Sequence, residues 1–127
     1  MKVALDSNRY ADLCRGIPEV VEQVAQAERV YLPLIVLGEL RAGFHAGNRA
    51  RLNEKVLVRF LGSPRARLLL PDEQTTLHYA SLFTQLRQQA TPIPTNDLWI
   101  AALVIQHHLV LLTRDAHFKA VPQLSQL

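Results

Sequence analysis

The stretch Asp97–Leu112, DLWIAALVIQHHLVLL, decides the fold class of this chain. After the acidic start at Asp97, the residues up to Gln106 are almost all apolar, which predicts a buried helix rather than a surface helix. The last four residues, Leu109–Leu112, form a continuous apolar run, as expected of a central strand in a parallel sheet. A buried helix followed by a buried strand is typical of an α/β sandwich built around a parallel sheet.

The remaining sequence repeats this alternation of strand and helix. Further strands are predicted at residues 2–5, 30–32 and 68–70, with an edge strand or a tail from Val121. Helices are predicted to begin near Ser7 or Asn8, Pro18, Pro33, Asn48 and Asp72. The segment 91–96, TPIPTN, has two prolines and no helical period, which predicts a rigid loop. We therefore expect one α/β domain.

Composition restricts the class of protein. The chain has 127 residues, of which 49% are hydrophobic and 20% charged, the balance of a globular domain. No apolar run reaches the roughly 18–20 residues of a membrane helix, and Asp6 interrupts the first apolar stretch too early for a secretion signal. The single cysteine, Cys14, cannot form an internal disulfide. We therefore expect a cytoplasmic protein without membrane association.

The net charge of +3 is unevenly distributed along the chain. Residues 41–67 contain seven cations and a single acid, Glu54. Three of these cations, Arg51, Lys55 and Arg59, are spaced by four residues and would form one stripe on a helix. Such a stripe is either a solvated helix face or a surface for a polyanion. The second interpretation requires a phosphate-directed site elsewhere in the chain.

Two acidic residues follow predicted strands. Asp6 comes directly after the strand at 2–5, and Asp115 follows Leu109–Leu112 by a two-residue step. Because ligands bind at the carboxyl ends of parallel strands, this topology brings Asp6 and Asp115 to one edge of the sheet. Each carboxylate also has an ordinary explanation as a helix N-cap, and neither interpretation is favoured when the residue is taken alone.

Glu39 and Asp97 are the other two candidate acids. Asp97 lies near a helix start, where the helix dipole already favours an anion. Glu39 lies within the apolar run LIVLGELRAG (34–43), and glutamate is rarely buried without a partner, so a salt bridge to an arginine is the alternative. If Glu39 faces the crevice, four carboxylates meet there, and a divalent cation would relieve their repulsion. Oxygen ligands favour Mg²⁺ or Mn²⁺. The chain has neither the paired cysteines nor the HExxH sequence that would indicate a zinc site.

Four motifs occur in an order that resembles a known family. They are LDSN (5–8), GELRAG (38–43), PTNDLWIAA (94–102) and TRDAHF (113–118). The first two are short and weak on their own, whereas the last two at this spacing are specific. Together the motifs resemble the PIN-domain family, in particular the VapC-type ribonuclease toxins of prokaryotic toxin–antitoxin pairs, over essentially the whole chain.

The resemblance implies a fold, an activity and partners. The fold would be a single PIN domain over residues 1–127, a three-layer α/β/α sandwich with a central, mostly parallel sheet of four or five strands. The activity would be hydrolysis of RNA phosphodiester bonds by a metal-activated water, with one or two Mg²⁺ or Mn²⁺ ions and no covalent intermediate. The family also implies a homodimer and a cognate antitoxin protein that blocks the site.

The resemblance also assigns roles to individual residues. The catalytic metal site would consist of Asp6, Glu39, Asp97 and Asp115, with Asp6 and Asp97 as the most direct ligands. Ser7 and Asn8 would support the first loop, and Thr113 would orient the last carboxylate or a water. The family usually has threonine at Ser7 and an aliphatic residue at Arg9, so Arg9 places a cation near the RNA path. The candidate RNA contacts are Arg9, Arg41, Arg51, Lys55, Arg59 and Arg114.

Two aromatic side chains within these motifs each have two possible roles. His117, two residues after Asp115, lies either near the phosphate or in a structural or exposed position. For Trp99, core packing is favoured over stacking on an RNA base.

Two other functions compete with this interpretation. A non-catalytic module would bind RNA or a protein through residues 41–67, although binding alone gives no reason to gather carboxylates near a polyanion. An aspartate-phosphorylated enzyme or receiver domain also has an aspartate after its first strand. Haloacid-dehalogenase-like phosphatases, however, have a second aspartate where this chain has Asn8, and the early paired acids and late lysine of receiver domains are missing.

Overall fold

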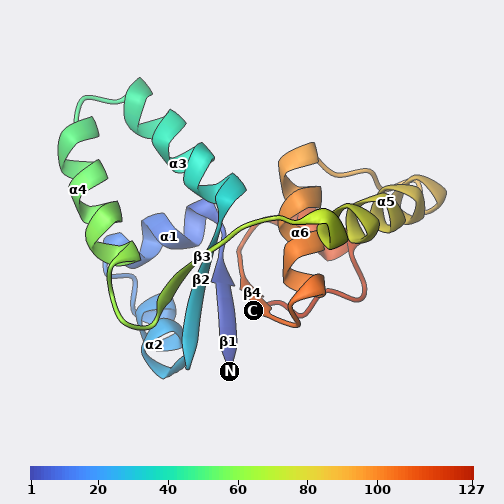
Figure 1. Ribbon diagram of the computed structural model, residues 1–127, viewed down its shortest axis with the longest axis horizontal. Coiled ribbons are helices and arrows are strands. Elements are labelled where there is room, and N and C mark those ends of the chain that lie inside the picture. Colours follow the sequence, from blue (N-terminus) through green and yellow to red (C-terminus); the bar gives the residue numbers. More distant parts are fainter.

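A four-stranded parallel sheet forms the centre of the computed structural model, which describes residues 1–127 (Figure 1). Its strands are β1 (Lys2–Leu5), β2 (Arg29–Pro33), β3 (Ala66–Leu69) and β4 (Val110–Leu112), in the order β3-β2-β1-β4. Within this sheet Val3 pairs with Val30 on one side and with Val110 on the other. The predicted parallel sheet is thereby confirmed, with β1 and β2 at its centre.

Helices cover both faces of the sheet. They are α1 (Ser7–Cys14), α2 (Pro18–Gln26), α3 (Leu34–Ala46), α4 (Ala50–Leu61), α5 (Glu73–Gln88) and α6 (Thr95–Gln106), followed by the 3₁₀ helix η1 (Ala116–Ala120). Figure 1 shows α1, α2 and α4 on one side of the strands and α5 and α6 on the other. This arrangement is the expected three-layer α/β/α sandwich. None of the helices combines the length and hydropathy needed to cross a bilayer.

The core is centred on β1, β4 and α6. The side chains of Val3, Ala4 and Leu5 are fully buried, as are Leu111 and Leu112 on the neighbouring strand. Helix α6 is buried along residues 100–104, in agreement with the helix predicted from its apolar sequence. Because β1 lies between β2 and β4, its carboxyl end, and therefore Asp6, is positioned by strands on both sides.

Several predicted helix starts differ from the observed ones. Asp6, rather than Ser7 or Asn8, caps α1, because its side chain accepts a hydrogen bond from the backbone N–H of Arg9. Helix α6 begins at Thr95, since Pro94 takes the extended conformation that precedes a first turn, so the loop at 91–96 is shorter than predicted.

Other boundaries also shift. Pro33 is both the last residue of β2, paired with Leu69, and the N-cap of α3, which begins one residue later at Leu34. Asn48 does not cap α4, whose N-cap residue, Arg49, makes no capping side-chain bond. The possible final strand is limited to an isolated bridge between Leu111 and Gln126.

Two helices expose apolar side chains that repeat at helical spacing along the sequence. On α4, Leu52 and Val56 are 55% and 40% exposed, whereas Leu57 is fully buried. On α5, Leu77 and Phe83 are likewise exposed. Helical spacing alone therefore does not place these side chains in the core, because α4 turns Leu57 toward the sheet and α5 packs through other residues, such as Leu82 and Leu86.

Candidate active site

Asp6 lies at the carboxyl end of β1 and is 5% exposed. One of its carboxylate oxygens accepts the backbone N–H of Arg9 at 2.8 Å, and the other accepts the hydroxyl of Thr113. Burial raises the pKa of Asp6 above its ordinary value, and repulsion from Asp115 adds to this rise, while the two hydrogen bonds oppose it. The charged form of Asp6 is therefore costly in the absence of a nearby cation.

Thr113 connects Asp6 to Asp115. It follows β4, which is paired with β1, so its hydroxyl donates to Asp6 and also accepts the backbone N–H of Asp115 at 3.0 Å. Asp115 in turn caps η1 by accepting the backbone N–H of His117 at 2.9 Å. Thr113 therefore holds the carboxylate of Asp6 and the backbone of Asp115, and it does not contact the Asp115 carboxylate itself.

Asp97 lies in the first turn of α6 and faces η1. Its Oδ2 atom is 2.9 Å from Nδ1 of His117, and the same ring nitrogen is 3.1 Å from Oδ1 of Asp115. Burial raises the pKa of Asp97, the hydrogen bond with His117 opposes this rise, and repulsion from Asp115 and Glu39 adds to it. His117 therefore lies beside the acids, while its side chain remains 52% exposed.

Glu39 reaches the same site from α3. Its Oε1 accepts the hydroxyl of Ser7 at 2.7 Å, and its Oε2 accepts the side-chain amide of Asn96 at 3.3 Å. The salt bridge to an arginine that was the alternative for Glu39 does not form, and Arg41, two residues away, pairs with Glu54. Asn96 was not identified from the sequence, although it lies inside the PTNDLWIAA motif.

The four acids form a continuous series of neighbours across the ends of β1 and β4. Repulsion acts between Asp6 and Asp115, between Asp115 and Asp97, and between Asp97 and Glu39. None of the four forms an ion pair with a lysine or arginine. A set of carboxylate oxygens without a cationic partner has the donor chemistry that suits Mg²⁺ or Mn²⁺.

The arginines near this site are held by a buried acid on α1. Arg9 donates to Asp12 and Glu19 at 3.2 Å each, and its side chain is 9% exposed. It is therefore not available to RNA, and that interpretation of Arg9 is wrong. Arg114 donates to Asp12 at 2.9 Å and 3.3 Å but remains half exposed, directly before Asp115.

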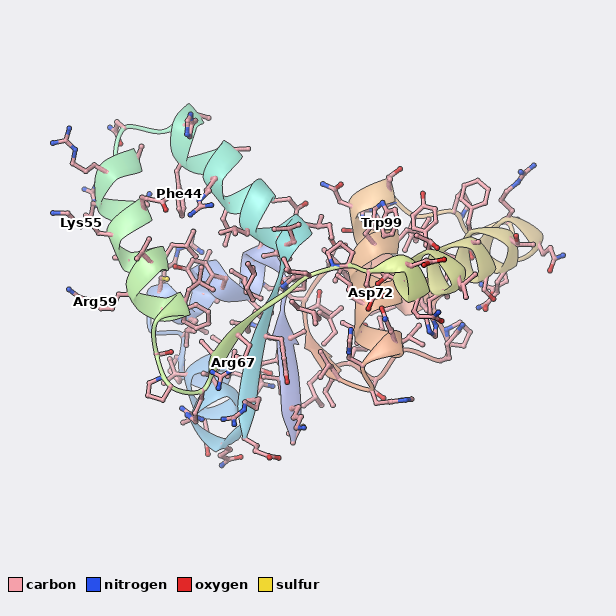
Figure 2. The ribbon with its side chains drawn as sticks, viewed as in Figure 1. Phe44, Lys55, Arg59, Arg67, Asp72 and Trp99 are labelled. Carbon is pink, nitrogen blue, oxygen red and sulfur yellow. The ribbon has the colours of Figure 1, made fainter.

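The other predicted RNA contacts and supporting residues lie on the surface. Arg51, Lys55 and Arg59 are exposed on α4, and Figure 2 shows Lys55 and Arg59 projecting from the side of α4 that faces away from α6. Asn8 is exposed and makes no side-chain hydrogen bond, so the expected support of the first loop comes from Ser7 alone.

Trp99 stacks on Tyr79 with ring centroids 4.2 Å apart, which agrees with a packing role.

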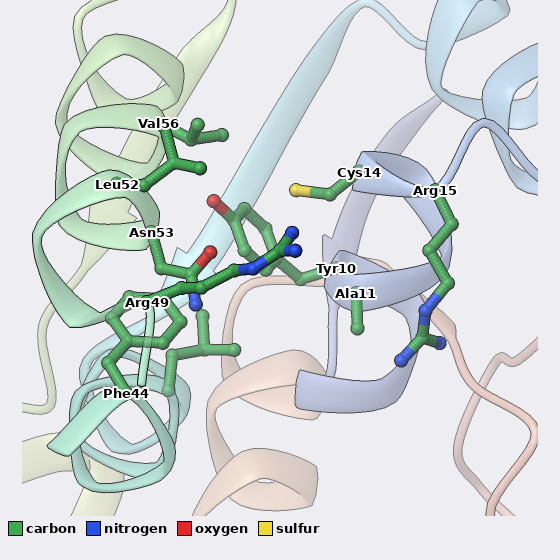
Figure 3. A pocket seen from close by; sticks show the side chains of 10 residues that line it. Tyr10, Ala11, Cys14, Arg15, Phe44, Arg49, Leu52, Asn53 and Val56 are labelled. Carbon is green, nitrogen blue, oxygen red and sulfur yellow. The ribbon is translucent and has the colours of Figure 1, made fainter. Parts of the chain in front are cut away.

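A pocket of about 520 Å³ lies between α1 and the hairpin of α3 and α4 (Figure 3). Its lining is mainly apolar and includes Tyr10 from α1, Phe44 from α3, and Leu52 and Val56 from α4. Figure 3 shows the side chain of Arg49 extending across the pocket toward Tyr10. The Tyr10 hydroxyl is buried without a hydrogen-bond partner. The sequence did not predict this pocket, because helical spacing does not show whether the rest of the chain covers Leu52 and Val56.

Comparisons with known proteins agree with this geometry. The sequence model of the PIN domain matches residues 4–124. "Ribonuclease VapC1" of Haemophilus influenzae (strain R2866) is 31% identical over 115 residues, covering 87% of this chain and 84% of the relative. "Ribonuclease VapC4" of Mycobacterium tuberculosis is 32% identical over 89 residues, covering 70% and 68%.

Solved structures give the same result. VapBC-1 from nontypeable Haemophilus influenzae has a TM-score of 0.87 and 28% identity, covering 100% of this chain and 97% of the other. VapBC2 from Rickettsia felis, bound to a DNA fragment from its promoter, has a TM-score of 0.86 and 27% identity, covering 100% and 98%. The chain therefore belongs to the PIN-domain family, among its VapC-type members.

Proposed function

We propose that this chain is a metal-dependent endoribonuclease that acts as the toxin of a type II toxin–antitoxin pair. The observation that carries the proposal is the convergence of Asp6, Glu39, Asp97 and Asp115, from four separate segments, with no lysine or arginine paired to them. Relatives named Ribonuclease VapC support RNA as the substrate. The VapBC structures support a toxin role and a cognate protein partner.

The metal would be Mg²⁺ or Mn²⁺, as one or two ions. Asp6 and Asp97 would be the most direct ligands, and Glu39 and Asp115 would contribute directly or through water. A divalent ion in such a site supplies an acidified, oriented water and neutralises charge on the phosphate. Because the pKa values of Asp6 and Asp97 are raised by burial, a cation would stabilise the charged forms that the fold alone disfavours.

The surrounding residues would keep the acids in position during the reaction. Thr113 bridges Asp6 and the backbone of Asp115, so the carboxylates that follow β1 and β4 cannot separate independently. Ser7 and Asn96 each hold one oxygen of Glu39, which fixes the direction of its flexible side chain. Such support matters because partners of metal ligands typically change affinity or activity 10–100-fold when removed.

Arg114 is the cation best placed to meet an RNA phosphate at this site. It directly precedes Asp115, its side chain is half exposed, and Asp12 fixes one edge of its guanidinium group. The exposed stripe of Arg51, Lys55 and Arg59 would act at longer range by attracting the polyanion. Arg41 would contribute less, because Glu54 already neutralises it.

The partners of the proposed toxin would be a cognate antitoxin and a second copy of the chain. The pocket between α1 and the α3–α4 hairpin suits an apolar segment of the antitoxin, because Leu52 and Val56 are exposed there beside the unpaired Tyr10 hydroxyl. The exposed apolar residues of α5, including Leu77 and Phe83, offer a separate surface for a homodimer. Light scattering of the purified chain measures directly whether it forms this homodimer.

A metal-titrated cleavage assay tests the enzymatic proposal. Asp6→Asn and Asp97→Asn should each lower the rate by at least about 100-fold, since each removes a negatively charged ligand. Glu22→Gln, an exposed acid on α2, is the matched control and should cleave like the parent. Cleavage by both site variants at the parent's rate would favour the rival function, a non-catalytic RNA- or protein-binding module. Full cleavage in EDTA would contradict the metal requirement.

A further inference from the structure

The imidazole of His117 lies between two of the acids of the proposed metal site. Its Nδ1 atom is 2.9 Å from Oδ2 of Asp97 and 3.1 Å from Oδ1 of Asp115. Asp97, Asp115 and His117 each offer one possible metal-ligand atom, and these three atoms lie within 4.8 Å of one another. We propose that His117 is a nitrogen ligand of this metal centre and makes it selective for Mn²⁺ over Mg²⁺. The inference rests on the proposed function, since it assumes that the acids bind a divalent ion.

The separations fit two ligands of one octahedral ion. Mg²⁺ binds ligands at about 2.1 Å in near-octahedral geometry, so adjacent ligands at right angles are about 3.0 Å apart. The distances from Nδ1 of His117 to the oxygens of Asp97 and Asp115 lie on either side of this value. Because all three ligand atoms lie within 4.8 Å of one another, they can bind one ion once Nδ1 of His117 carries no proton.

The local fold holds the imidazole in this position. The backbone N–H of His117 donates to Oδ1 of Asp115 at 2.9 Å, which fixes the start of η1 against the acid. The next residue, Phe118, is 1% exposed and anchors η1 in the core. The other ring nitrogen of His117 has no hydrogen-bond partner in the chain, and the side chain is 52% exposed.

The donor chemistry gives the direction of the selectivity. Carboxylate oxygens suit both Mg²⁺ and Mn²⁺, so the four acids alone distinguish the two ions weakly. Imidazole nitrogen is a softer donor that suits transition metals, whereas Mg²⁺ prefers oxygen. One nitrogen ligand added to an oxygen set should therefore increase affinity for Mn²⁺ and leave affinity for Mg²⁺ nearly unchanged.

The test combines a spectroscopic signature with binding affinities, both measured on the full chain without substrate. Pulsed electron paramagnetic resonance of the Mn²⁺-loaded parent should show coupling to a directly bound ¹⁴N nucleus, and His117→Gln should lose it. Calorimetry should show that His117→Gln weakens Mn²⁺ binding about tenfold or more, with Mg²⁺ binding changed less than about threefold. Glutamine keeps an oxygen donor of similar reach, so the variant removes mainly the nitrogen. His107→Gln, at the opposite end of α6 from Asp97, is the matched control and should behave as the parent.

The outcomes separate this inference from the proposed function. Mn²⁺ binding without ¹⁴N coupling in the parent, or coupling that survives in His117→Gln, would overturn the ligand role while leaving the carboxylate site intact. An equal loss of affinity for both ions would overturn the selectivity. Failure of the folded parent to bind either ion would instead refute the metal-dependent function itself. Circular dichroism of each variant establishes that the fold is retained.

Discussion

Replacing Asp12 with alanine should destabilise the chain by about 3 kcal/mol, because Asp12 neutralises a buried arginine. Asp12 is 5% exposed and accepts hydrogen bonds from Arg9, Arg15 and Arg114. Removing one partner of a buried pair costs about 3–5 kcal/mol, since the remaining charge is left uncompensated. Arg9 would keep only its bond to the exposed Glu19, and its Nε atom already lacks a partner. The lower end of this 3–5 kcal/mol range applies because Glu19 still pairs with Arg9 in the variant.

Urea denaturation of a double-mutant cycle measures this cost. Asp12→Ala alone should lower the free energy of unfolding by about 3 kcal/mol. Adding Arg9→Met should restore a large part of this loss, since no buried charge then remains. Arg15→Ala is the control, because that exposed ion pair is worth about 0–1 kcal/mol. A loss below 1 kcal/mol in Asp12→Ala, or no recovery in the double variant, would refute this account of the network.

The same residue predicts a dependence of stability on pH. The hydrogen bond from Arg114 is the largest cause that holds the pKa of Asp12 below its ordinary value of 3.8, and Arg9 adds to it. A lowered folded pKa means that this stabilisation is present above pH 3.8 and is lost as the pH falls through the folded value. The difference in unfolding free energy between parent and Asp12→Ala should therefore shrink over that acidic window, and a constant difference would contradict the assignment.

Three further predictions concern the active site and the basic helix. Asp6→Asn should raise the free energy of unfolding in EDTA by about 1 kcal/mol, because the variant lacks a desolvated charge. Mg²⁺ or Mn²⁺ should raise the melting temperature of this variant less than it raises that of the parent. Ser7→Ala should lower the cleavage rate about tenfold with little change in fold, because Glu39 loses its 2.7 Å hydrogen bond, whereas an unchanged rate would assign Glu39 a minor role. Lys55→Ala in an Asp6→Asn background should reduce the salt dependence of RNA binding by about one unit of slope in a log–log plot, and an unchanged slope would remove this face of α4 from the RNA path.

The fold and half of the acidic site could be predicted from local patterns and topology, whereas Glu39 and Asp97 were assigned only through the resemblance of their motifs to a known family. A continuous apolar run such as Leu109–Leu112 identifies a parallel strand, and parallel strands end at the same edge of a sheet. These two facts bring Asp6 and Asp115 together without any knowledge of the helices. The observed bridge through Thr113 then follows from the pairing of β1 with β4.

The other half of the site depends on contacts that no local pattern contains. Glu39 points to the acids because Ser7 and Asn96, which are 32 and 57 residues away in the sequence, each hold one of its oxygens. Arg9 was misassigned for a related reason: its buried position depends on Asp12, one turn later, and on Glu19 across the junction of α1 and α2. A sequence shows the charge of such a side chain but not the acid that neutralises it.

The exposed apolar residues of α4, Leu52 and Val56, show a different limit of sequence patterns, and it bears on the proposed partner. Apolar residues at helical spacing show which side chains share a face, but they do not show whether the chain itself covers that face. Here Leu57 is fully buried, while Leu52 and Val56 remain exposed and line the pocket beside α1. An exposed apolar lining of this kind is costly for an isolated chain, and it fits the partner segment that the proposed function calls for. Under that proposal, Leu52 and Val56 belong to a surface for the partner, whereas Leu57 belongs to the core of the chain itself.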